Sequence, residues 1–83
     1  MNTLEDILTT NGFELNENFE AVYTIEFDSK DDVYEMLEYI KQRSSIDVFV
    51  NINEELSIAD FFFQAQNHSP DIIEHTVNLI INA

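Results

Sequence analysis

EFDSKDDVYEMLEYIKQR, residues 26–43, shows the pattern from which the rest of the chain can be interpreted. Its apolar side chains recur at i, i+3, i+4 and i+7, the spacing that gathers them on one face of a helix. They are Val33, Met36, Leu37 and Ile40. Ser29 followed three residues later by Asp32 is typical of a capping box at a helix start. The stretch therefore predicts an amphipathic helix.

The acidic residues of this helix need a separate explanation. Asp31 and Glu35 stand four residues apart, where like charges destabilise a helix by a few tenths of a kcal/mol. All three basic residues of the chain, Lys30, Lys41 and Arg43, lie at the two ends of the segment, so its middle is uncompensated. We interpret this charge as serving a partner rather than the fold.

The composition of the whole chain supports that interpretation. Its 83 residues suit one domain, 1–83, and 45% hydrophobic residues are enough for a core. Seventeen acidic residues against three basic give a charge of −14, beyond the magnitude of roughly 2 to 8 that serves solubility. Such a charge disfavours direct binding to nucleic acid or to an anionic membrane, and predicts a basic partner. A solubility device or a halophilic habit is the alternative explanation.

Cysteine content and apolar runs indicate the compartment. The chain has no cysteine, so nothing marks an oxidising compartment. The first residues lack the charged and apolar regions of a signal peptide, and no apolar run is long enough to span a bilayer. We expect a cytoplasmic protein.

Strands are predicted by alternation on both sides of the helix. The inward side chains before the helix fall on odd positions: Phe13, Leu15, Phe19, Ala21, Tyr23, Ile25 and Phe27. Residues 16–18 are the expected turn, and the opposite face is acidic, with Glu14, Glu20, Val22, Thr24, Glu26 and Asp28. After the helix, a third strand is expected from the inward residues Ile46, Val48, Val50 and Ile52, with Asp47 and Phe49 outward.

Helix starts and stops complete the outline. Thr3 can cap a first helix through Leu4, Ile7 and Leu8 that ends at Gly12. Ser57 with Asp60 resembles a second capping box, opening a helix through Ile58, Phe61, Phe62 and Ala65 to near Asn67. Ser69-Pro70-Asp71 predicts the start of a final apolar helix.

These elements predict an α+β domain in the order α-β-β-α-β-α-α. A small, antiparallel-containing sheet of about three strands, covered on one face by helices, is the simplest way to bury the apolar stripes. Val22, Phe49 and Phe63 do not fit the core of a monomer, and the last helix is apolar on more than one side. We therefore expect a homodimer.

The residues needed for catalysis or cofactor binding are few. Pro70 breaks any common helix between His68 and His75, so they do not form a helical metal site. A single glycine excludes a glycine-rich phosphate loop, and the acidic run 28–35 lacks the ligand spacing of a calcium loop. We predict that the protein is no enzyme and has no cofactor or metal.

The acidic surface itself remains as the candidate site. Same-face residues repeat about every 6.6 Å along a strand and about every 6 Å along a helix, against one charge per about 3.4 Å on each DNA strand. Carboxylates could thus form a sparse row that lysines and arginines bind in place of phosphates. We predict that partner binding uses Glu14, Glu17, Glu20, Glu26, Asp28, Asp31, Asp32, Glu35, Glu38, Asp47 and Phe49.

In length, charge and α+β pattern, the whole chain resembles the small acidic DNA-mimic proteins that bacteriophages use in host takeover, although no signature motif is shared. The resemblance implies an inhibitor in the host cytoplasm that competes with DNA for a basic DNA-binding protein. Targets of that class include nucleoid-associated proteins such as HU, restriction enzymes, uracil-DNA glycosylase and CRISPR effectors. The alternative is an immunity or antitoxin-type module that caps a basic toxin or nuclease.

Overall fold

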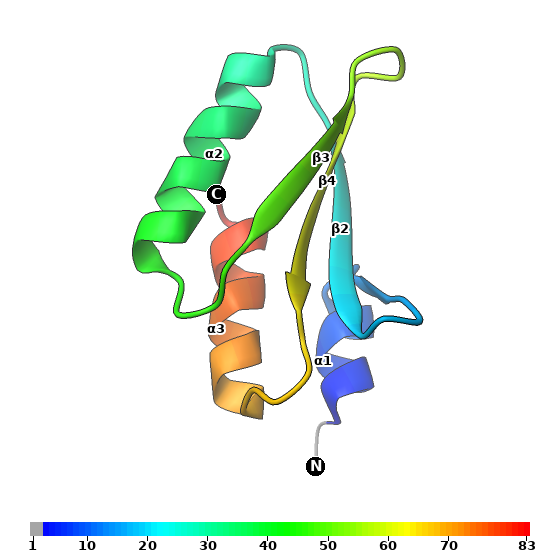
Figure 1. The fold of residues 1–83 in the computed structure, drawn as a ribbon, viewed down its shortest axis with the longest axis vertical. Helices are drawn as coiled ribbons and strands as arrows, with labels where there is room; N and C mark the ends of the chain where they lie inside the picture. The colour runs from blue at the N-terminus through cyan, green and yellow to red at the C-terminus, as the bar shows by residue number, and fades with distance from the viewer. Residues whose placement is uncertain (1–2) are drawn as a thin grey trace.

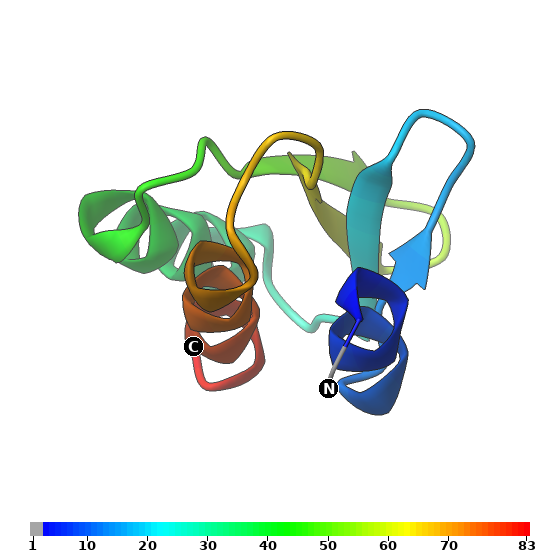
Figure 2. The ribbon, with the colours of Figure 1, turned by 90° about the horizontal axis from the view of Figure 1, so that it is seen from below.

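In the computed structural model, which describes residues 3–83, three helices lie on one face of a four-stranded antiparallel sheet (Figures 1 and 2). The elements are α1 (Leu4–Thr10), β1 (Glu14–Leu15), β2 (Glu20–Glu26), α2 (Lys30–Arg43), β3 (Phe49–Asn53), β4 (Ile58–Gln64) and α3 (Pro70–Ile81). The strand order is β1-β2-β4-β3. The predicted α+β class is confirmed, but the sheet has four strands and the element order is α-β-β-α-β-β-α.

The predicted helix from Ser57 to near Asn67 is wrong, because this segment forms the central strand β4. The residues that suggested a helix also fit a strand, in which Ala59, Phe61 and Phe63 are buried at every second position. A run of aromatic residues favours a strand, and β4 finds hydrogen-bonding partners on both sides, in β2 and β3. Ser57 is no N-cap: with φ +53° it belongs to the turn that joins β3 to β4.

The helix starts follow the sequence closely. Thr3 forms a capping box with Asp6, and Gly12, with φ +83°, follows α1 in the left-handed conformation that glycine tolerates. Ser29 caps α2 by accepting from the backbone N–H of Asp31 rather than by the expected box with Asp32. Ser69 and Pro70 begin α3 as predicted.

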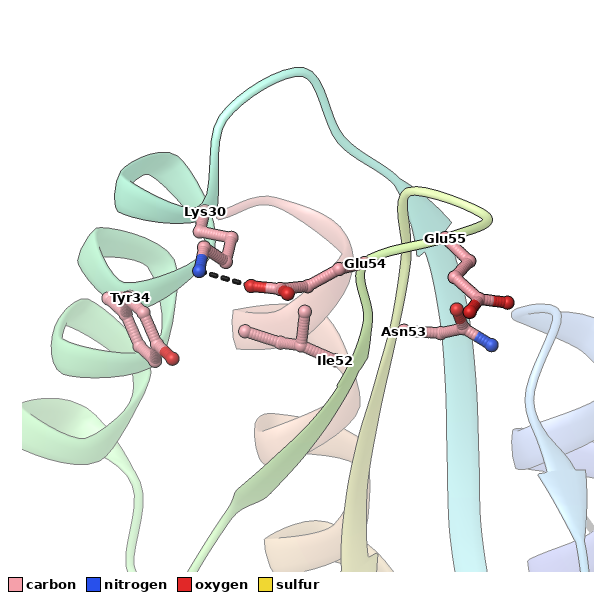
Figure 3. A pocket seen from close by; sticks show the side chains of 6 residues that line it. All are labelled: Lys30, Tyr34, Ile52, Asn53, Glu54 and Glu55. Carbon is pink, nitrogen blue, oxygen red and sulfur yellow. Dashed lines mark hydrogen bonds and ion pairs between the residues drawn. The ribbon is translucent and has the colours of Figure 1, made fainter.

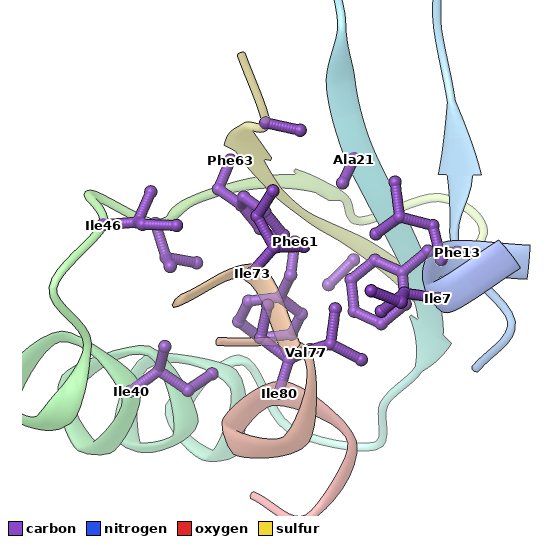
Figure 4. Close-up of a cluster of buried hydrophobic side chains, with 14 of the residues drawn as sticks. Ile7, Phe13, Ala21, Ile40, Ile46, Phe61, Phe63, Ile73, Val77 and Ile80 are labelled. Carbon is purple, nitrogen blue, oxygen red and sulfur yellow. The ribbon is translucent and has the colours of Figure 1, made fainter. Parts of the chain in front are cut away.

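The core lies between the sheet and the helices (Figure 4). Its largest fully buried side chains include Phe61 and Phe63 of β4 and Leu8 of α1. Phe13 stacks on Tyr23, with ring centroids 4.8 Å apart. α2 contributes Val33 and Ile40. α3 contributes Ile73, Thr76, Val77 and Ile80.

This packing changes the grounds for a dimer. Phe63 is fully buried, so the expectation that it does not fit a monomer core is wrong. The apolar side of α3 is likewise buried in the core. Among the large hydrophobic residues of α3 in the described chain, only Ile72 is exposed. Val22 is half-buried and Phe49 is exposed, and both lie on the sheet face away from the helices. The homodimer stays a prediction.

Two further details differ from the sequence pattern. Phe19 is 49% exposed rather than inward, because it ends the turn before β2 with φ +59°. β3 begins at Phe49, later than expected, although Ile46 and Val48 are buried as the alternation predicts. Ser44 fixes that preceding segment, since its hydroxyl bonds to both the N–H and the carbonyl of Ile46.

Candidate protein-binding surface

One face of the sheet carries no helix (Figure 2). The strand register places alternate residues of every strand on this side. We call it the open sheet face; its residues are Glu14 of β1, Glu20, Val22, Thr24 and Glu26 of β2, Ile58, Asp60, Phe62 and Gln64 of β4, and Phe49, Asn51 and Asn53 of β3. The acidic outer face predicted for residues 14–28 is therefore present except for Asp28, which lies beyond the end of β2, and no element of residues 3–83 covers this face.

An apolar row crosses the centre of the open sheet face. Val22 pairs with Phe62, and Phe62 pairs with Phe49, so the three side chains lie side by side on neighbouring strands. We call these three residues the apolar row. The rings of Phe49 and Phe62 are 5.6 Å apart between centroids, and Phe49 remains 50% exposed. Since neighbouring strands are about 4.8 Å apart, the row is roughly 10 Å long.

Carboxylates surround this row. Glu14 continues it on β1, because Glu14 pairs with Val22. Glu20 and Asp60 belong to the pairs on either side of the row, about 6.6 Å away along the strands, and Glu26 lies one pair further. We call Glu14, Glu20, Glu26 and Asp60 the rim carboxylates. An open hollow of about 350 Å³ lies among Asn16, Glu20, Val22, Asn51, Asp60 and Phe62.

Hydrogen bonds orient two of the rim carboxylates. Asp60 accepts from the hydroxyl of Thr24, its partner across the two central strands. Glu20 accepts from the side-chain amide of Asn16, at 3.0 Å. Both donors are neutral, so these bonds bring no cation to the two carboxylates, whose remaining lone pairs can accept from a cationic partner.

The acidic residues of α2 lie on a different face of the molecule. Asp31, Glu35 and Glu38 follow the i, i+4, i+7 spacing on the side of the helix away from its buried residues Val33 and Ile40. All of them are exposed, as is Asp32. We call Asp31, Asp32, Glu35 and Glu38 the α2 carboxylates. The strand and helix acids thus do not form one continuous row.

The remaining predicted site residues are scattered around these two faces. Glu17 is at the tip of the turn between β1 and β2, Asp28 lies in the loop before α2, and Asp47 precedes β3. Each is exposed, and none belongs to the strand pairs that form the open sheet face.

All the lysines and arginines of the chain lie on α2, and two of the three contact another side chain. Lys30 forms an ion pair with Glu54 in the turn after β3, beside Tyr34 (Figure 3). The hydrogen bond and charge of this pair raise the pKa of Lys30 and lower the pKa of Glu54. The guanidinium of Arg43 lies 3.8 Å from the ring centroid of Tyr39. The open sheet face therefore contains four carboxylates and no lysine or arginine.

Asp60 and Phe62 were not among the residues predicted for partner binding. The sequence pattern assigned them to a helix, and only the alternation of Ala59, Phe61 and Phe63 could have placed them on an outward strand face. With them, the predicted residue Phe49 becomes part of an aromatic pair rather than an isolated exposed side chain.

Residues 3–83 do not bring metal-ligating side chains together. They contain no group of three or more histidine, aspartate or glutamate side chains placed to hold a metal ion. His68 and His75 are both exposed, and Nε2 of His75 lies 3.4 Å from the carbonyl oxygen of Arg43. Of the helices in this range, none has the length and apolar character needed to cross a membrane.

Comparison with known proteins identifies no relative. No protein-family model matches the chain. No curated protein and no solved structure matches it either.

Proposed function

We propose that the protein is a DNA-mimic inhibitor, which presents carboxylates to a basic DNA-binding protein and so competes with DNA. The partner would be a nucleoid-associated protein such as HU, a nuclease, or another protein of that chemistry in the cytoplasm. Lysines and arginines that normally neutralise phosphates would bind the carboxylates instead. The protein would act by binding alone.

The observation that carries this proposal is the uneven distribution of charge. The chain has a charge of −14, and its three basic residues are confined to α2. The carboxylates of the open sheet face consequently face solvent with no compensating cation on that face. The fold gains nothing from this repulsion, because like charges disfavour the compact state. A basic partner would compensate these charges.

The spacing of the carboxylates is compatible with DNA mimicry. Glu20 and Glu26 lie six residues apart on β2, which corresponds to about 20 Å along the strand. Asp31 and Glu35 are about 6 Å apart along α2. Phosphates on one DNA strand are more closely spaced, at about 3.4 Å of axis each, so a partner would use a subset of its phosphate-binding residues.

A capture experiment tests the proposal. The protein is immobilised and exposed to bacterial lysate, and bound proteins are eluted first with a short DNA duplex and then with salt. We expect a basic DNA-binding protein in the DNA eluate, and none on a control column carrying the protein with both the rim and the α2 carboxylates replaced by amides. If DNA elutes nothing, the mimic proposal is wrong. A basic partner released only by salt would instead favour the immunity or antitoxin-type module.

A further inference from the structure

The two acidic surfaces of the protein differ in the apolar side chains that lie among their carboxylates. The α2 carboxylates surround a helix side that is entirely polar apart from the exposed rings of Tyr34 and Tyr39. The rim carboxylates instead surround the contiguous apolar row of Val22, Phe62 and Phe49. Interfaces obtain most of their binding energy from a few well-packed residues near their centre, often aromatic, while rim charges contribute mainly to rate and specificity.

From this difference we infer that the open sheet face is the docking surface, and that its occupant is a basic protein segment with an apolar or aromatic side chain between its lysines and arginines. The apolar side chain packs on Phe49 and Phe62, and the flanking cations reach Glu14, Glu20 and Asp60. The inference rests on the proposed function only in requiring a basic partner. The α2 carboxylates then act at longer range, by attracting the partner.

Charge complementarity selects this occupant over the alternatives. A second copy of the chain on the same face would bring two sets of four rim carboxylates together, with no lysine or arginine on either face. Like charges placed opposite each other across an interface cost several kcal/mol. A nucleic acid or an anionic lipid surface would meet the same repulsion. A cationic protein segment meets attraction from every rim carboxylate.

The geometry also fits a short segment. The apolar row is roughly 10 Å long, and the rim carboxylates of the adjacent pairs are about 6.6 Å to either side of it. This footprint matches two turns of a helix or a few residues of extended chain. Glu20, Asp60 and Phe62 line the same open hollow, which can receive the end of an apolar side chain beside two carboxylates.

Two synthetic peptides test the inference directly. Both have six lysine or arginine residues; one has phenylalanine and leucine at its centre and the other has serine at those two positions. Each is titrated into the isotope-labelled protein at low salt, and backbone NMR shifts are followed. We expect the apolar peptide to bind about tenfold tighter or more and to shift β2, β3 and β4 rather than α2. Equal affinities, no binding, or shifts centred on α2 would overturn the inference.

Matched variants separate the two acidic surfaces. Amide replacement of the rim carboxylates and amide replacement of the α2 carboxylates each remove four charges. The first should weaken the apolar peptide at least several-fold more than the second, and Phe49→Ser should remove the advantage of the apolar peptide. If the α2 set has the larger effect, the open sheet face is not the docking surface. A second copy covering this face would appear as a dimer in light scattering that Phe49→Ser dissociates, and would also overturn the inference.

These outcomes are independent of DNA competition. The proposed function fails if a DNA duplex releases no basic protein from the immobilised chain, whatever the peptides do. The docking inference fails on the peptide and variant results alone, even if competition with DNA is demonstrated.

Discussion

Replacing Phe49 by alanine is the sharpest single change that the structure offers. Phe49 is 50% exposed and packs against Phe62 at one end of the apolar row. A phenylalanine buries about 150–250 Å² when fully covered, so a partner would remove about 75–125 Å² of Phe49 from water. At about 25 cal/mol per Å², this burial is equivalent to roughly 2–3 kcal/mol. We expect Phe49→Ala to weaken partner binding roughly 20- to 200-fold.

Tyr34 supplies a matched control for this experiment. It is an aromatic side chain that is 53% exposed, but it lies on α2 beside the Lys30–Glu54 pair. Calorimetric titration of the captured DNA-binding protein into the wild-type protein, Phe49→Ala and Tyr34→Ala should give a large loss for the first variant and a small one for the second. Urea unfolding of the free variants checks the fold, since Phe49→Ala also loses the contact with Phe62 and the half of the ring that is buried in the free protein. Equal losses of affinity in the two variants would refute the reasoning.

Four further measurements test the charges, the core, the ion pair and the predicted homodimer. Amide replacement of the α2 carboxylates should leave the free energy of unfolding unchanged or raised, most clearly at low salt, and should slow association with the partner, as stopped-flow kinetics would show; unchanged association would separate these charges from binding. Phe61→Ala removes a fully buried ring from β4 and should lower the free energy of unfolding in urea by about 3–5 kcal/mol, whereas a loss below about 1 kcal/mol would contradict the described core. Because the pKa of Glu54 is lowered, the Lys30–Glu54 pair stabilises the fold fully above the ordinary glutamate pKa, and this stabilisation is lost as pH falls through the lowered value. Because the pKa of Lys30 is raised, the stabilisation is also fully present below the ordinary lysine pKa and is lost only as pH rises through the raised value. The difference in Tm between the wild type and Glu54→Gln should therefore vanish in acid, and a difference that is constant with pH would contradict the pair. The predicted homodimer, finally, should appear in light scattering at moderate salt, where repulsion is screened, and should persist in Phe49→Ser, because the open sheet face is assigned to the basic partner; a monomer at high micromolar concentration would rule the homodimer out.

Much of the fold could be predicted from short-range patterns. The helix boundaries could be predicted because caps and left-handed positions depend on neighbouring residues alone; they are marked by Thr3, Gly12, Ser29 and Pro70. The alternation along β2 also assigned its acidic face correctly, because one period-2 pattern fits that stretch and no competing helical pattern does.

The segment 58–64 could not be assigned in the same way. Its apolar residues satisfy both a helical and an alternating pattern, and the choice depends on β2 and β3, which supply hydrogen-bonding partners from distant parts of the chain. The set of partner-binding residues predicted from the sequence lacks Asp60 and Phe62 for the same reason. Asp60 and Phe62 become neighbours of Thr24, Val22 and Phe49 only through strand pairing, so the apolar row cannot be recognised before the sheet order is known.

The rim and the α2 carboxylates are proposed to take the place of DNA on a basic protein. Fluorescence anisotropy of a labelled DNA duplex bound to a nucleoid protein such as HU, or to the captured partner, measures this competition as the acidic protein is added. We expect the anisotropy to fall to the value of free DNA, and the variant lacking both the rim and the α2 carboxylates to leave it unchanged. DNA that stays bound at a large molar excess of the wild-type protein would contradict the proposed function.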